Sequence, residues 1–88
     1  MKTRRMRLLR KKHSIPLLEL GRYCDASQQR LSQIELDMGP ATAHTNRLIE
    51  VAFNRLITAR RRDLAALEAD FQTYRKRLLD FVNEEETI

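Results

Sequence analysis

Apolar and polar positions follow a helical period over much of this chain. Between residues 14 and 37 the apolar side chains form two short stripes, separated by only a few residues. The first stripe consists of Ile15, Leu18, Leu20 and Cys24, and the second of Ala26, Leu31, Ile34 and Leu36. Each spacing predicts an amphipathic helix, because side chains three or four positions apart share one helix face. We therefore expect two short helices joined by a tight turn.

The residues at the start of the second stripe are suited to begin a helix. Ser27 stands where an N-cap is expected, since its hydroxyl can accept a backbone N–H of the next turn, and Gln28 then opens the second helix. Asp25 can adopt the turn conformation that bulky residues disfavour. The stretch from Ser14 to Asp37 is therefore typical of a helix-turn-helix.

Polar side chains that can hydrogen-bond to bases lie on the second helix, opposite its apolar stripe. They are Gln28, Gln29, Ser32 and Gln33. A glutamine can pair with adenine through two hydrogen bonds in a DNA major groove, and this needs no metal or cofactor. A solvated helix face without a partner would have the same composition. The flanking residues distinguish these two interpretations.

The flanking residues resemble those of the Xre/Cro-type regulators, to which the lambdoid phage repressors belong. The resemblance covers roughly Met6 to Ala52 and rests on Met6, Leu9 and Arg10, on Leu20 and Gly21, on Ala26 and Ser27, and on Ile34 and Glu35. It implies an all-α, phage-repressor-like helix-turn-helix domain whose glutamine-rich recognition helix reads bases. It also implies that Arg10 and Glu35 form a largely buried ion pair.

The sequence departs from this family at several positions. Leu17 stands where a phosphate-contacting Gln is common, and Pro16 stands where a Ser cap is usual, although Pro is tolerated in the first helical turn. Asp25 replaces a turn Gly, and the Gly expected after Glu35 appears only at Gly39. These departures leave the geometry of the two loops open.

Candidate contacts to the DNA backbone come from the basic N-terminal run and from the helix that starts near Thr42. Arginines of the run could lie along phosphates, and in the family the N-terminus of the fourth helix touches phosphates, partly through its N–H groups. The expected contacts are Arg4, Arg5, Ser27, Arg30, Thr42, His44, Thr45, Asn46 and Arg47. Either Leu48 or Val51 could fill the main core position of the fourth helix.

The charge of the chain is unevenly distributed. The 17 Lys and Arg exceed the 12 Asp and Glu, for a formal net charge of +5. Residues 1–40 hold nine basic and four acidic side chains, whereas residues 41–88 hold eight of each. This asymmetry favours a polyanionic partner for the N-terminal half, because phosphate contacts supply most non-specific affinity for DNA. A membrane surface would also attract this charge.

The segment Met1–Lys12 is expected to form a first helix that packs through Met6 and Leu9. It lacks the long apolar stretch of a signal peptide or a membrane-spanning helix. We therefore expect a cytoplasmic protein with no membrane partner.

The second half of the chain has the composition of a long helix. From Thr42 to Ile88 it contains no Gly or Pro and is rich in Ala, Leu, Arg and Glu. Apolar residues recur with the heptad spacing of a coiled coil, at Ile57, Leu64, Leu67, Phe71, Tyr74, Leu78 and Phe81. We expect a DNA-binding domain in residues 1–55 and a homodimerisation helix in residues 56–88. The alternative is an amphipathic helix folded back on its own domain. The run of arginines at residues 60–62 could also mark a kink.

Arg60 is the charged residue that interrupts this seam. In a parallel pair it would face Arg60 of the second copy. In an antiparallel pair that places Leu64 opposite Phe81, it would face Glu85, which is a counter-ion. The sequence therefore favours the antiparallel pair.

No catalytic or metal-binding constellation stands out. The chain has no Gly-rich phosphate loop, and Cys24, His13 and His44 form no metal-ligand cluster. We expect no enzymatic activity, no cofactor and no metal. The sequence predicts a dimeric transcriptional repressor that reads a palindromic operator in the major groove of double-stranded DNA. The alternative is a protein-interaction module, such as an antitoxin whose C-terminal helix binds a heterologous partner.

Overall fold

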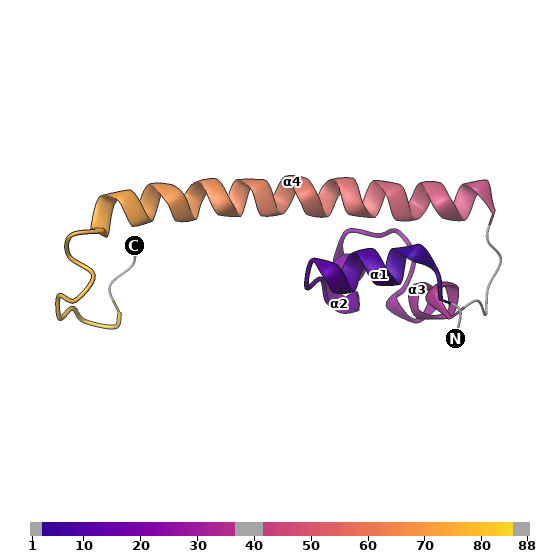
Figure 1. Ribbon diagram of the computed structural model, residues 1–88, viewed down its shortest axis with the longest axis horizontal. Coiled ribbons are helices and arrows are strands. Elements are labelled where there is room, and N and C mark those ends of the chain that lie inside the picture. The colour runs from indigo at the N-terminus through magenta and orange to yellow at the C-terminus, as the bar shows by residue number, and fades with distance from the viewer. Residues whose placement is uncertain (1–2, 37–41, 86–88) are drawn as a thin grey trace. The chain divides into compact units, whose positions relative to one another are not determined.

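The computed structural model describes residues 3–36 and 42–85, which contain helices and no strand (Figure 1). The helices are α1 (Arg5–Lys12), α2 (Leu17–Arg22), α3 (Gln28–Glu35) and α4 (Ala43–Tyr74). The expectation of an all-α chain with a long C-terminal helix is confirmed. The predicted loop around Gly39 and Pro40 lies outside the described residues.

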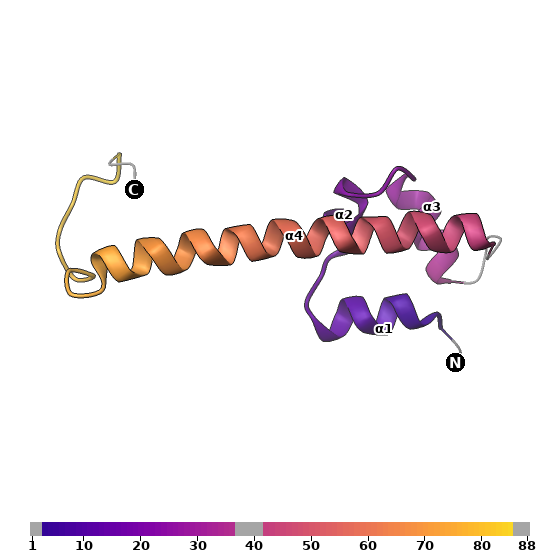
Figure 2. The same ribbon diagram turned by 90° about the horizontal axis from the view of Figure 1, so that it is seen from above.

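The chain divides into two compact units, Met1–Ile57 and Thr58–Ile88. The division falls slightly later than the boundary expected after residue 55. The helix α4 contributes its N-terminal half to the first unit and continues into the second without a break (Figure 2). The sequence allowed a kink at residues 60–62, and α4 runs through these residues as one helix.

The helix α3 contributes the buried Leu31 and Ile34 to the core of the first unit. One cluster of this core is built from α4 and from the segment that contains α2. Its buried residues are Ile15, Leu20, Ala52 and Leu56, and the half-buried Met6, Tyr23, Cys24 and Phe53 pack against them. Leu48 and Val51, the two expected core residues of α4, are only half-buried. The buried face of α4 carries the small side chain of Ala52, which is completely buried. Leu9 is exposed, so of the expected packing residues on α1 only Met6 contacts the core.

The chain leaves α1 through Ser14, whose φ of 53° lies in the left-handed region. The N–H of Ser14 donates to the carbonyl of Lys11 at 3.2 Å, and the N–H of Ile15 donates to the carbonyl of Arg10 at 2.9 Å. These two bonds form a Schellman motif, which satisfies carbonyls at the end of the helix. Asp25, for which the sequence predicted a special turn conformation, has no positive φ. The chain turns between α2 and α3 without a left-handed residue at that position.

The helix predicted to reach Ile88 ends instead at Tyr74. Arg75, Lys76 and Arg77 follow directly, and cations are favourable at the negative C-terminal end of a helix. Local side-chain contacts follow in this segment. Arg77 Nε donates to Asp80 Oδ2 at 3.1 Å, and Asn83 Oδ1 accepts the N–H of Glu85 at 3.2 Å. The second contact is a side-chain to backbone bond of the kind that competes with helix formation.

Two members of the expected heptad seam are affected by this early end. Leu78 and Phe81 lie beyond α4 and therefore do not belong to its helical face. The register that paired Arg60 with Glu85 required a helix through residue 85, whereas Glu85 lies in a turn.

Candidate nucleic-acid interface

The helix α3 begins as the sequence predicts. Ser27 is its N-cap, with extended backbone angles, and the Ser27 Oγ accepts the N–H of Arg30 at 3.1 Å. This bond satisfies one of the backbone donors that the first turn of a helix leaves without a partner. The position of the first residue of α3, Gln28, is therefore well defined.

The two faces of α3 differ sharply in burial. Leu31, Ile34 and Glu35 are buried on the inner face. On the outer face Gln28, Gln29 and Gln33 are exposed, and Ser32 is half-buried. The four residues expected to read bases are therefore accessible together on one side of one helix.

The outer face of α3 borders an open hollow of about 530 Å³ within the first unit. Its lining consists of Leu17, Gln28, Gln29, Ser32, Gln33 and Leu36. The structure thus brings the four expected base-reading residues to one hollow and adds two leucines. Neither leucine was predicted at this site. In the sequence Leu17 is a departure from the family pattern, and Leu36 is a member of the apolar stripe.

The helix α2 approaches α3 closely at Gly21. A Cβ atom at Gly21 would lie 3.7 Å from the Cβ of Gln28 and 4.0 Å from the Cδ1 of Leu31. Leu17 lies four residues before Gly21 and therefore on the same face of α2. The side of α2 that carries Leu17 thus faces the beginning of α3.

The C-terminal end of α3 is held by Arg10. Its Nε donates to Glu35 Oε1 at 2.8 Å, and its Nη2 donates to Glu35 Oε2 at 2.9 Å. The side chains of Arg10 and Glu35 are 13% and 2% exposed. Hydrogen bonding to the Glu35 carboxylate raises the pKa of Arg10, and partial burial opposes this shift. The structure therefore places the pair implied by the family resemblance in direct, largely buried contact.

Arg4 also contacts the end of α3. Its Nε donates to the backbone carbonyl of Ile34 at 2.8 Å, and the Thr3 hydroxyl lies 3.5 Å from the carbonyl of Glu35. Terminal helix carbonyls lack partners within the helix, so these contacts satisfy two of them. Arg4 was expected on a phosphate, and the sequence carried no signal for this structural contact.

The N-terminus of α4 contains an expected phosphate contact that is not accessible. Thr42 Oγ1 accepts the N–H of Thr45 at 3.1 Å, and the two hydroxyl oxygens lie 3.0 Å apart. Thr45 is 3% exposed, because it lies on the inner face of α4 together with Ala52 and Leu56. The expected phosphate contact of Thr45 is therefore wrong. Thr42 acts as a helix cap, and its neighbours on the outer side, His44, Asn46 and Arg47, are exposed.

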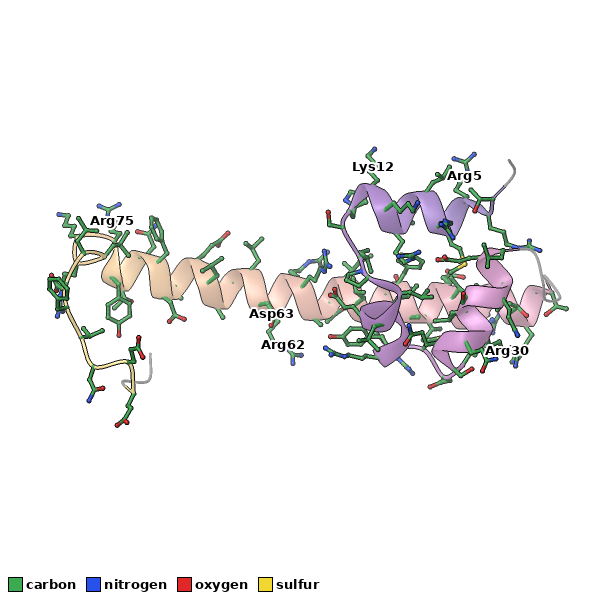
Figure 3. The ribbon with its side chains drawn as sticks, turned by 90° about the horizontal axis from the view of Figure 1, so that it is seen from below. Arg5, Lys12, Arg30, Arg62, Asp63 and Arg75 are labelled. Atoms are coloured by element: carbon green, nitrogen blue, oxygen red, sulfur yellow. The ribbon has the colours of Figure 1, made fainter. Side chains whose placement is uncertain are left out.

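A second cavity of about 290 Å³ lies between the beginnings of α1 and α4 in the first unit. Among its lining residues are Arg4, Arg5, Thr42 and Asn46. Four of the expected phosphate contacts are therefore neighbours in space although they come from distant parts of the sequence. Figure 3 shows Arg5 and Arg30 extending from different edges of this unit, and both side chains are exposed.

The residues of the expected dimer interface that lie on α4 are largely uncovered. Ile57, Leu64, Leu67 and Phe71 are between 48% and 64% exposed, and Tyr74 is half-buried. Over the described parts of the second unit, residues 58–85, no side chain is fully buried. The expected interface residues on α4, namely Ile57, Leu64, Leu67, Phe71 and Tyr74, are called the α4 apolar row below.

In residues 3–36 and 42–85 no helix combines the length and the hydrophobicity of a membrane span. The same residues contain no group of three or more His, Cys, Asp or Glu side chains placed to hold a metal ion. Comparison of the chain with protein-family models, with curated proteins and with solved structures finds no match.

Proposed function

We propose that this protein is a sequence-specific DNA-binding transcriptional regulator whose α3 enters the major groove. The observation that carries the proposal is the outer face of α3, where Gln28, Gln29, Ser32 and Gln33 line one open hollow. An α-helix fits the major groove, and side-chain amides and hydroxyls can hydrogen-bond to base edges there. The inner face of the same helix packs in the core, and Arg10 binds its Glu35. These contacts fix the orientation of α3 and therefore the side on which the four polar side chains lie.

Exposed positive charge of the first unit supports the same function. Arg5, Arg30 and Arg47 are exposed on α1, α3 and α4, and Asn46, next to Arg47 in the chain, is exposed as well. Side chains of this kind contact phosphates, which fixes the orientation of a protein on the duplex but does not select the sequence. We assign phosphate contact to these residues and base reading to the hollow.

The α4 apolar row supports pairing with a second copy. The helix available for pairing ends at Tyr74, so the facing residues differ from those expected from the sequence. An antiparallel pair centred between Ala65 and Ala66 would place Leu64 opposite Leu67 and Arg60 opposite the ring of Phe71, where a cation is favourable. A palindromic operator would match the two-fold symmetry of such a dimer.

Charged residues beside the row would add both attractive and repulsive contacts to this pairing. In the antiparallel arrangement Arg61 would approach Glu68 of the second copy, which is attractive, and Asp63 would approach Asp70, which is repulsive. A parallel pair would place Arg60 opposite Arg60 and Asp63 near Glu68. The antiparallel pair therefore has the better balance of charges.

A titration of the full chain against the promoter DNA of its own gene tests the proposal, with random-sequence DNA alongside and at several salt concentrations. Gln28→Ala should cost about 1–3 kcal/mol of binding free energy on the specific site and little on random DNA. Gln72→Ala is the matched control, because Gln72 is an exposed glutamine of α4 outside the hollow. Equal losses on both DNAs would contradict base reading by Gln28. A chain with no affinity for DNA at low salt would favour the protein-interaction alternative.

A further inference from the structure

Two leucines interrupt the polar lining of the hollow at α3. Leu36 is 45% exposed, and Leu17 is half-buried. Neither side chain can hydrogen-bond to a base. The major groove, however, presents one apolar group, the C5-methyl of thymine, and apolar side chains contact it.

The two leucines lie near opposite ends of α3. Leu17 lies on the face of α2 that meets the beginning of α3, as the closeness of Gly21 to Gln28 shows. Leu36 is the C-cap of α3, and its N–H donates to the carbonyl of Ser32 at 3.1 Å. The rise from Gln28 to Leu36 is about 12 Å, which spans at most about four base-pair steps.

We propose that Leu17 and Leu36 are specificity-determining residues that contact thymine methyl groups at two positions of each DNA half-site. The inference rests on the proposed function and adds a class of base to it. The glutamines and Ser32 supply hydrogen bonds to base edges, and the leucines supply contacts that only a methylated pyrimidine satisfies. The two thymines lie within about four base pairs of each other, because the length of α3 limits their separation.

The test replaces thymine by deoxyuridine, which removes the methyl group and leaves every hydrogen-bonding group in place. The probe is the duplex of highest affinity selected by the full chain from a random-sequence pool. Each thymine of this duplex is replaced in turn, and the Kd is measured for the wild type, Leu17→Ala and Leu36→Ala. Leu18→Ala is the matched control, because Leu18 is an exposed leucine of α2 outside the hollow.

At two positions in each half-site, the wild type should bind the deoxyuridine duplex about three- to fivefold more weakly, the effect of losing one buried methyl group. Leu17→Ala should bind thymine and deoxyuridine equally at one of these positions, and Leu36→Ala should do so at the other. The control variant should keep both preferences. Circular dichroism of each variant establishes that the helices are retained.

Three results would overturn the inference, and they differ in what they say about the proposed function. If the wild type selects a defined sequence but ignores every thymine methyl, methyl reading is wrong and DNA recognition stands. If Leu17→Ala weakens binding but keeps the full thymine preference, Leu17 positions Gln28 and does not read the base. If no defined sequence is selected, sequence-specific binding itself is wrong.

Discussion

The guanidinium of Arg10 donates to both carboxylate oxygens of Glu35, and its Nη1 donates to the backbone carbonyl of Ile15 at 2.9 Å. One side chain of α1 therefore contacts the end of α3 and the segment that leads into α2. Because Glu35 is almost fully buried, its charge depends on Arg10 for compensation. The contact holds α3 in place from the side opposite to its exposed glutamines.

Removing one partner of this pair should destabilise the protein more than removing both. Arg10→Met or Glu35→Met is expected to lower the free energy of unfolding by roughly 3–5 kcal/mol, since each leaves a buried charge uncompensated. The double variant should lose less than the sum of the two. Urea unfolding of the four proteins gives the coupling, and additive losses would contradict an energetic link between the two side chains.

The same pair fixes the pH range in which the charge of Arg10 contributes. Its pKa is raised in the folded state, so the stability from its charge is fully present below the ordinary pKa of arginine and is lost only above it. No loss of stability between about pH 7 and about pH 10 should therefore arise from Arg10.

Ser27 offers a way to separate helix capping from DNA binding. Asp is as good an N-cap as Ser, so Ser27→Asp should keep the stability of the wild type, whereas Ser27→Ala should lose about 1 kcal/mol. A carboxylate at this position would repel phosphates, so Ser27→Asp should bind all DNA sequences more weakly. Thermal unfolding and DNA titration measure the two effects. A Ser27→Asp protein with unchanged DNA affinity would place Ser27 away from the phosphates.

Gly21 is expected to tolerate a methyl group. It has no positive φ, and an added Cβ would make ordinary van der Waals contacts with Gln28 and Leu31. Gly21→Ala should therefore stabilise the protein by about 0.5–1 kcal/mol, because Ala is the better helix former. Gly21→Leu should instead displace Gln28 and weaken specific DNA binding. A loss of stability in Gly21→Ala would show that α2 and α3 require an even closer approach.

The α4 apolar row should determine the oligomeric state. Phe71→Asp, on the exposed side of α4, should give a monomer that stays helical and binds DNA weakly and without cooperativity. Gln72→Asp is the control, because it adds the same charge to the neighbouring exposed position outside the row. Light scattering and DNA titration measure both properties. A dimeric Phe71→Asp protein, or a wild type that is monomeric at micromolar concentration, would contradict pairing through this row.

The helices of the first unit could be predicted because their signals are local. The start of α3 follows from Ser27, and its buried stripe follows from the spacing of Leu31 and Ile34. The pairing of Arg10 with Glu35 was available only through the family resemblance, since periodicity does not identify a partner that lies 25 residues away.

Other features depend on tertiary structure or on competing local contacts. Thr45 and Ala52 are buried because the rest of the unit packs on that face of α4. The sequence did not identify this face, since either Leu48 or Val51 could have filled the main core position. The end of α4 at Tyr74 does not follow from the helix-forming composition of the segment. There the N–H of Arg77 donates to the carbonyl of Tyr74 at 2.8 Å and the N–H of Asp80 to the carbonyl of Arg77 at 3.2 Å, which are the bonds of turns. Leu17 and Leu36 enter the hollow from two different helix ends, so no single sequence pattern links them.

The division of α3 into a buried and an exposed face has a consequence for how this protein can diversify. Substitutions at Gln28, Gln29 and Gln33 leave the buried contacts of Leu31, Ile34 and Glu35 untouched. Exposed positions of this kind change stability by only about half a kcal/mol in either direction. Mutation can therefore explore new binding preferences on the outer face with little risk to folding. Duplicated copies of such a gene can diverge in what they recognise while they keep one common scaffold, and the same face is a practical target for a combinatorial library.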